Sequence, residues 1–230
     1  GTLRYEYRRP INELFINPSV SFNRLWENTQ TALSIDNGIY TYSQRRYNSV
    51  NDAYSTEVNA SKGFFNLHLK TSLGAAFSYG EGVQISNETA EKCSSKILTL
   101  TPKVSFNPSW GEFNYDGAFT ISNATMGVIS QQSLLSWRQS LSYTATIGAL
   151  DLTMSAVHYH SEQLSSATST ALIANASAVL RLKKVRIEAE MRNIFDNRRY
   201  VVASYGSIFS STTAYNLRQR EAIISVQIVL

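Results

Sequence analysis

Apolar and polar residues alternate along most of this chain, and this alternation restricts its fold more than any other feature. In the last stretch, Ala222–Leu230, every even position is apolar and the odd positions are mixed. Side chains of a strand point alternately to the two faces of a sheet, whereas a helix would scatter this pattern around its axis. The alternation therefore predicts an all-β chain whose strands each have one apolar face.

The pattern recurs about a dozen times along the chain, so we expect about twelve antiparallel strands. It is clearest in Phe65–Tyr79, Glu112–Ile121 and Leu135–Ile147. Many of these segments are roughly 10 to 15 residues long, whereas strands of soluble domains usually have about five or six. A tilted strand that spans a membrane needs about nine to eleven residues. Strand length therefore favours a transmembrane β-barrel over a soluble barrel or sandwich.

Short and long connections alternate between the expected strands. Short turns are predicted near residues 28, 63, 109, 148 and 184, and longer connections near residues 48, 88, 127, 165 and 205. The longest expected loops are Gln44–Asp52, Gly80–Lys96 and Asn197–Thr213. Outer-membrane barrels have short periplasmic turns and long extracellular loops. In that orientation Leu230 is periplasmic, whereas Arg218 and Arg220 lie at the outer rim.

Composition is consistent with this interpretation. Charged residues make up 17% of the chain, below the average of about 25% for soluble proteins. A run of 18 apolar residues, which a transmembrane helix needs, is absent from the sequence, but barrel strands do not need one. The net charge of +4 is spread along the chain without a basic stripe, so we expect no nucleic-acid partner. The single cysteine, Cys93, excludes an internal disulfide.

Aromatic residues fall mostly near the expected strand ends, where the interfacial girdles of a barrel place them. They are Trp26, Tyr40, Tyr79, Trp110, Trp137, Tyr159, Tyr200 and Tyr215. Ordinary β-propensity would also enrich such residues in strands, so no single aromatic decides between the two explanations.

Residues that carry chemistry in other proteins form no complete set here. His158 and His160 have a spacing found among metal ligands, but no cysteine or carboxylate on their strand face completes a site. Glu112 and Asp116 would be about 13 Å apart on one strand face, which is too far for a glycosidase pair. A nucleophile motif such as G-x-S-x-G is also absent from the sequence.

Glu188 and Glu190 are closer together, but Arg186 and Arg192 flank them on the same face. This arrangement indicates a solvated, charge-balanced barrel wall. We therefore expect no catalytic, metal-ligating or cofactor-binding residues and no enzymatic activity, and the sequence does not identify the ligand-binding residues.

Several segments resemble the outer-membrane receptors that depend on TonB. The segment Arg192–Asp196 (RNIFD) precedes Tyr215–Glu221 (YNLRQRE) and the final strand, as at the end of these receptors. Phe15–Phe22 and Leu98–Phe106 also look like strands of this family, so the resemblance covers most of the chain. The greatest similarity is to the large receptor-like barrel proteins of Bacteroidetes.

The resemblance implies a barrel of about 22 strands, of which residues 1–230 would be the C-terminal part of the barrel domain. An N-terminal plug, the first half of the barrel and a segment that contacts TonB would lie outside the chain. Implied partners are outer-membrane lipid, TonB through the plug, and the barrel-assembly machinery, which reads the last strand. One departure is that many outer-membrane proteins end in an aromatic residue, whereas this chain ends in Leu230.

The sequence thus predicts part of the barrel wall and extracellular ligand-binding loops of a nutrient transporter in the outer membrane of a Gram-negative cell. Two alternatives remain open. One is a soluble β-barrel or sandwich that binds a small apolar ligand in its interior. The other is a complete outer-membrane protein of about twelve strands, acting as a pore or a lipid-modifying enzyme.

Overall fold

The computed structural model describes residues 1–37, 39–86, 88–130, 132–162, 164, 169–205 and 210–228. Nearly all of them lie in β-strands, apart from two short 3-10 turns and the connections, so the prediction of an all-β chain is confirmed. None of the helices in these residues is long and apolar enough to cross a membrane.

Thirteen strands form one sheet. They are β1 (Thr2–Arg4), β2 (Tyr7–Arg9), β3 (Leu14–Asp36), β4 (Ile39–Phe64), β5 (Leu69–Ser86), β6 (Thr89–Phe106), β7 (Glu112–Met126), β8 (Ile129–Ser130), β9 (Leu134–Ile147), β10 (Leu150–Ser161), β11 (Thr170–Arg181), β12 (Val185–Arg192) and β15 (Glu221–Ile228). A separate hairpin joins β13 (Arg199–Tyr205) to β14 (Ser210–Asn216).

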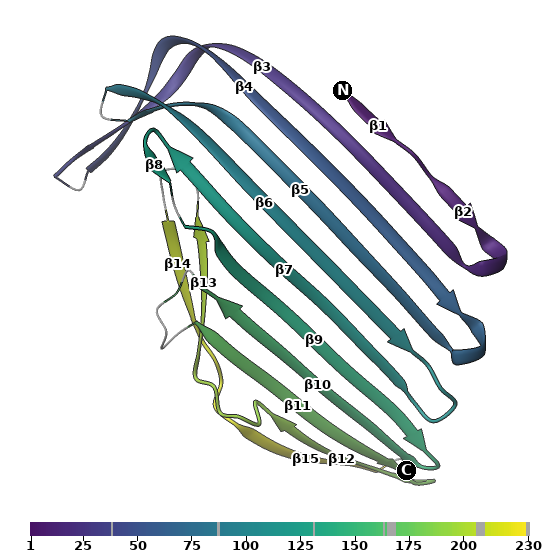
Figure 1. Ribbon diagram of the computed structural model, residues 1–230. Coiled ribbons are helices and arrows are strands. Elements are labelled where there is room, and N and C mark those ends of the chain that lie inside the picture. The colour runs from purple at the N-terminus through teal and green to yellow at the C-terminus, as the bar shows by residue number, and fades with distance from the viewer. Residues whose placement is uncertain are drawn as a thin grey trace.

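The order of the main strands in the sheet follows their order in the chain, and consecutive strands are antiparallel. β1 lies at one edge and β15 at the other. Within the described residues these two edges do not pair, and the sheet curves as a single open layer (Figure 1). A large antiparallel sheet is therefore present, whereas closure into a barrel is not observed in this part of the chain.

The two ends of the sheet differ in their connections. At one end, called the short-turn end, strands are joined by the 3-10 turns η1 (Pro10–Asn12) and η2 (Phe65–Leu67) and by brief connections after β6, β9 and β11. Gly148 in one of these has a φ of 61°, which favours glycine. The opposite end, called the long end, carries the β13–β14 hairpin and the tips of the longest strands (Figure 1). The predicted short turns near residues 109, 148 and 184 are confirmed.

Other predicted connections near the N-terminus were wrong. The expected turn near residue 28 is only a shift in strand register between Glu27 and Thr29, and β3 continues to Asp36. The expected loop Gln44–Asp52 lies inside β4. The turn placed at residue 63 follows slightly later, at η2.

Two of the expected long loops are also largely strand. Within Gly80–Lys96, β5 runs to Ser86 and β6 begins at Thr89. Most of Asn197–Thr213 belongs to the β13–β14 hairpin. The predicted loop near residue 165 and the terminal residue Leu230 fall outside the described residues, apart from the flanking positions.

The tip of the β3–β4 hairpin crosses toward β5. Beyond the register shift at Glu27, the hairpin bends, as bulged strands do, and a short parallel pairing joins Ala32 and Leu33 of β3 to β5. Ala32, Leu33 and Ile85 are buried there. These residues form a small apolar cluster at the long end. The cluster exists because β3 contacts β5, and a hairpin of β3 and β4 alone would leave Ala32 and Leu33 exposed.

The edge formed by β1 and β2 is interrupted opposite Pro18. Tyr5 donates its backbone N–H to the Pro18 carbonyl at 3.0 Å, but Pro18 has no N–H to return the bond. The two short strands therefore pair with β3 on either side of this position. On its other side Pro18 still pairs with Val58 of β4, so the effect of the proline is confined to the edge.

Candidate functional site

One face of the sheet carries large apolar side chains on almost every strand. Strand register places them side by side, for example Phe77 opposite Leu98, and Leu98 opposite Ile121. We call this surface the apolar face. Its members include Val20, Phe22, Tyr54, Leu73, Phe77, Leu98, Leu100, Ile121, Leu141, Met154, Leu172, Met191, Ile224, Val226 and Ile228.

The apolar face is uncovered. The fifteen side chains named above are between 36% exposed, at Leu172, and 77% exposed, at Ile224. The core of a soluble sandwich or barrel would bury such residues against a second layer. Within the described residues, no second layer packs on this face (Figure 1). Exposed apolar area of this extent marks a surface that contacts lipid or another protein.

Aromatic rings border the apolar face toward the long end. The ring centroids of Phe22 and Tyr54 are 4.7 Å apart, and those of Tyr54 and Tyr79 are 6.1 Å apart. Beyond these rings the same face becomes charged. Arg24 lies 5.7 Å from the Phe22 ring centroid, and Lys96 lies 5.8 Å from that of Tyr79.

A second aromatic group borders the apolar face at the short-turn end. The ring of Trp110 lies 6.2 Å from Phe106 and 6.1 Å from Tyr143. Lys62 lies 4.9 Å from the Phe64 ring centroid. Rings next to cations at both limits of an apolar band are typical of the two interfaces of a membrane-spanning segment.

The separation of these two borders can be estimated along β4. Tyr54 and Phe64, one at each border, both lie in this strand. At about 3.3 Å per residue they are about 33 Å apart along the strand. With a strand tilt of about 45°, the apolar band would be about 23 Å high, close to the height of about 25 Å in outer-membrane barrels.

The opposite face of the sheet, called the polar face, is linked by side-chain hydrogen bonds across strands. Ser21 and Ser55 are 2.7 Å apart, and Thr99 and Thr120 are 3.4 Å apart. Ion pairs continue the same ladder, including Lys103 with Asp116 at 3.2 Å. Asparagine, serine and threonine side chains satisfied in this way suit a solvated interior wall.

The carboxylates considered from the sequence have separate partners on the polar face. Glu112 accepts a hydrogen bond from Asn114 at 2.8 Å, while Asp116 faces Lys103. Glu188 and Glu190 pair with arginines on their own strand. The structure therefore brings neither pair together as a catalytic dyad.

His158 and His160 lie on the apolar face, where both contact Trp137. The Trp137 indole N–H donates to Nδ1 of His158 at 3.3 Å, and the ring of His160 stacks on Trp137 at 3.9 Å. The apolar face continues around them with Ala156 on β10 and with Leu172 opposite His158 on β11. In the described part of the chain, no three His, Cys, Asp or Glu residues are grouped closely enough to hold a metal ion.

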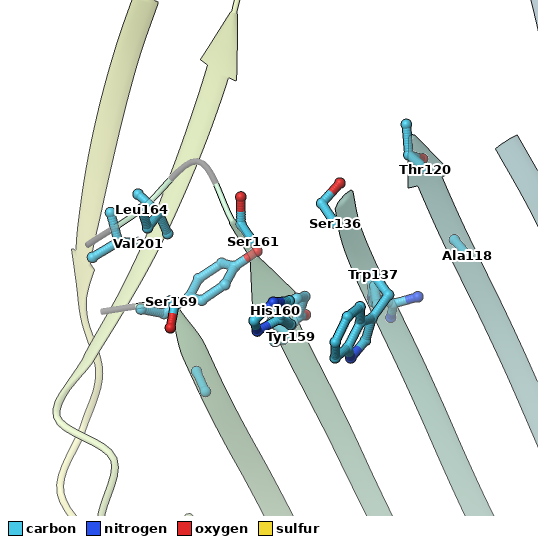
Figure 2. A pocket seen from close by; sticks show the side chains of 13 residues that line it. Ala118, Thr120, Ser136, Trp137, Tyr159, His160, Ser161, Leu164, Ser169 and Val201 are labelled. Carbon is cyan, nitrogen blue, oxygen red and sulfur yellow. The ribbon is translucent and has the colours of Figure 1, made fainter. Parts of the chain in front are cut away.

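A cavity of about 230 Å³ opens at the long end, where β7, β9, β10 and β11 approach the β13–β14 hairpin (Figure 2). Its walls include Ser136, Arg138, Tyr159, Ser161 and Tyr200, and we call it the tyrosine pocket. From their place in the sequence, Tyr159 and Tyr200 were expected only as interfacial aromatics. Their ring centroids are 4.4 Å apart, although the two residues lie in different sheets.

The aromatic row of the tyrosine pocket continues into the hairpin. Tyr215 stacks beside Tyr200 at 6.1 Å, and Arg138 lies 5.9 Å from the Tyr159 ring centroid. Burial raises the pKa of the Tyr200 hydroxyl, and the neighbouring Tyr159 raises it further, whereas the charge of Arg138 lowers it.

Two other aromatics expected at the interfaces, Trp26 and Tyr40, are not among the described lining residues of this pocket. Trp26 lies exposed on the apolar face beyond the aromatic border. The side chain of Tyr40 is outside the described part of the structure.

Asn193 anchors the hairpin that forms one side of the pocket, a role that sequence reasoning missed. Its buried side chain donates to the carbonyls of Asn197 and Arg218, each at 2.8 Å, and accepts from the Asn197 N–H at 3.0 Å. Its own N–H donates to Asn175. The backbone of Asn193 is left-handed, at φ 49°, a conformation that asparagine adopts more readily than most residues. The asparagine at the end of a strand was therefore the signal that the sequence offered.

Asp196 supports the same connection. Its carboxylate accepts the backbone N–H of Arg220 at 3.0 Å and pairs with Arg198 at 3.3 Å. The hydrogen bond from Arg220 and the charge of Arg198 hold the pKa of Asp196 below its ordinary value. The RNIFD segment is thus the structural link between β12 and the β13–β14 hairpin.

In comparisons with known proteins, neither a family model nor a curated protein matches this chain. The resemblance to TonB-dependent receptors therefore rests on the short segments described above, and functional inference depends on the two faces of the sheet and on the tyrosine pocket.

Proposed function

We propose that the protein forms part of the wall of an outer-membrane β-barrel of the TonB-dependent receptor class. In this proposal the apolar face contacts lipid, the polar face lines the lumen, and the long end lies outside the cell. A plug and the remaining wall strands would come from outside residues 1–230. The chain would contribute ligand-binding surfaces to nutrient uptake and carry out no chemistry itself.

The observation that supports the membrane assignment most strongly is the uncovered apolar band between two aromatic borders. Exposed Leu, Ile and Phe side chains are unfavourable in water by about 25 cal/mol for each Å² of apolar surface. A bilayer removes this penalty without a second protein layer, and the estimated height of the band is close to that of the apolar band of outer-membrane barrels. A soluble protein would need to cover the same surface.

The two edges of the sheet support a wall that is completed by further strands. The outer edges of β1 and β15 present backbone N–H and C=O groups without partners among the described residues. In lipid each unsatisfied group costs several kcal/mol, so an open edge cannot remain within the membrane. Additional strands of the same barrel would satisfy these groups.

Leu98 and Thr99 provide a direct test, because neighbouring positions of β6 face opposite sides. We would replace Cys93 with serine, introduce Leu98→Cys or Thr99→Cys, attach a nitroxide and reconstitute each protein in lipid vesicles. A label at residue 98 should be relaxed by oxygen, which dissolves in lipid, and protected from a water-soluble nickel chelate. A label at residue 99 should show the reverse preference.

Equal accessibility of the two labels, or a label at residue 98 that neither reagent reaches, would contradict the lipid-facing assignment. The second result would indicate a closed protein core, as in the soluble alternative. The unlabelled protein floated with vesicles in a density gradient provides the control for membrane association.

A further inference from the structure

We propose that the tyrosine pocket binds a carboxylate-bearing sugar ring, such as a hexuronate unit of a glycan. The inference deepens the proposed function, on which it rests for the location of the pocket at the outer mouth of a barrel. It follows from three properties of the pocket, which are an available cation, an aromatic wall with hydroxyl groups, and the volume of a single ring.

Arg138 is the cation. It lies on the polar face, pairs with no carboxylate in the described residues, and contacts the Tyr159 ring. The arginines Arg181 and Arg192 of the same face have carboxylate partners at 2.5 and 2.6 Å. The planar guanidinium of arginine matches a carboxylate through two parallel hydrogen bonds. A ligand carboxylate would therefore give Arg138 the kind of partner that Arg181 and Arg192 have within the protein.

Acidic residues are absent from the described lining of the pocket. Glu162 follows the lining residue Ser161, but its carboxylate accepts the Leu135 N–H at 2.8 Å. Residues 163–168 and 206–209, which flank lining residues in the sequence, contain no Asp or Glu. The described lining therefore carries the positive charge of Arg138 and no negative charge, which favours an anionic ligand over a neutral or cationic one.

Tyr159 and Tyr200 supply an aromatic wall, and Ser136 and Ser161 place hydroxyl groups beside it. Figure 2 shows these serines at neighbouring strand ends around the opening. A sugar ring presents an apolar C–H face to such a wall and hydroxyl groups at its edge. An aromatic acid would use the wall and Arg138 but would leave the serine hydroxyls without ligand partners.

The volume limits the size of the bound group. Pockets for drug-sized ligands usually occupy about 300 to 1,000 Å³. The tyrosine pocket, at about 230 Å³, is smaller and suits one pyranose ring. A bulky metal chelate would not fit inside it, although a longer glycan would extend through the open side.

The test measures binding of sodium D-glucuronate to the protein in detergent micelles by ligand-observed NMR titration. D-glucose, which lacks the carboxylate, and benzoate, which lacks the hydroxyl groups, serve as comparison ligands. We expect glucuronate to bind at least tenfold more tightly than either. Because charge-assisted bonds from a guanidinium are among the strongest hydrogen bonds in proteins, Arg138→Gln should weaken glucuronate binding about tenfold or more.

Arg138→Lys keeps the charge but loses the planar fork, so it should give an intermediate affinity. Lys70→Gln removes a positive charge from the polar face near the short-turn end and should bind glucuronate as the wild type does. Equal affinity for glucuronate and glucose, tighter binding of benzoate, or unchanged binding by Arg138→Gln would each overturn the proposal.

The spin-label experiment on residues 98 and 99 separates this inference from the proposed function. If those labels show the expected contrast and glucuronate does not bind, only the pocket assignment fails. If glucuronate binds through Arg138 and the labels show no contrast, the site stands and the membrane assignment fails. Circular dichroism of each Arg138 variant verifies that the strand content is unchanged.

Discussion

At the scale of single residues, Asn193 ties the connection before β13 to two segments that lie 18 and 25 residues away in the sequence. Its side chain and backbone bond to Asn175 in β11, to Asn197 before β13, and to Arg218 after β14. All the polar atoms of its side chain are therefore used in positioning the β13–β14 hairpin over the polar face. An aspartate in its place would lose the two donated bonds, because a carboxylate only accepts.

Asn193→Ala should loosen this hairpin. The substitution leaves two carbonyls and one N–H without their partners, and each buried unsatisfied group costs about 1 to 3 kcal/mol. We expect hydrogen–deuterium exchange of β13 and β14 to accelerate, measured by mass spectrometry, while β9 and β10 exchange as before. Asn59→Ala, which removes an exposed hydrogen bond to Glu57, is the matched control. Unchanged exchange in the hairpin would contradict the anchoring role.

Sequence reasoning could identify the RNIFD segment as a motif but could not assign its structural role. The partners of Asn193 depend on how β12 and β15 pair across the inserted hairpin, which no local pattern encodes. Tyr159 and Tyr200 likewise meet only because the hairpin folds back toward β10. By contrast, strand spacing alone places Glu112 and Asp116 well apart and sets Glu188 and Glu190 beside Arg186 and Arg192, because spacing fixes which side chains share a face.

At the scale of the elements, the errors of prediction are concentrated where strands extend past the apolar band. Gln44–Asp52 and Gly80–Lys96 consist mostly of polar residues on both faces, with only a few apolar ones such as Ile85, so the alternation that identifies a half-buried strand is lost there. Backbone pairing nevertheless continues to the hairpin tips. The turns at the short-turn end were found because the alternating pattern continues almost to their first residues.

The two faces of β6 should respond differently to an added charge. Leu100→Lys places an ammonium group near the middle of the apolar band, which costs about 2 to 4 kcal/mol in a barrel wall. Thr99→Lys adds the same group to the polar face, where we expect a change below about 1 kcal/mol. The measurement is the free energy of unfolding by urea in lipid vesicles. Similar losses for the two variants would be inconsistent with one lipid-facing and one solvated surface.

At the scale of the whole molecule, the sheet is wide, single-layered and open at both edges. Its apolar residues are therefore not gathered in a central core, and the buried ones lie mostly in small clusters. Stability of such a layer depends on the medium against its apolar face and on the strands beside its edges. A sequence pattern indicates the two faces of this layer but contains no information on which segment completes the edges.

Hydrogen exchange along β15 should reveal its open edge. One side of this strand pairs with β12, so alternate amides are bonded and the others point to the unpaired edge. We predict alternating slow and fast exchange over Glu221–Ile228 in detergent micelles, resolved residue by residue by NMR. β9, which pairs on both sides, should be protected throughout and serves as the internal reference. Uniform protection of β15 would show that another strand already covers its edge.

The agreement between chain order and sheet order also has an evolutionary consequence. Because each main strand pairs with its neighbours in sequence, a segment such as β9–β10 begins and ends at the same rim of the sheet. Duplication or deletion of this segment would change the circumference while preserving the direction of every other strand. Such proteins can therefore acquire wider or narrower walls by gaining or losing whole hairpins. Each added hairpin brings one tight turn at the short-turn end and one new connection at the long end.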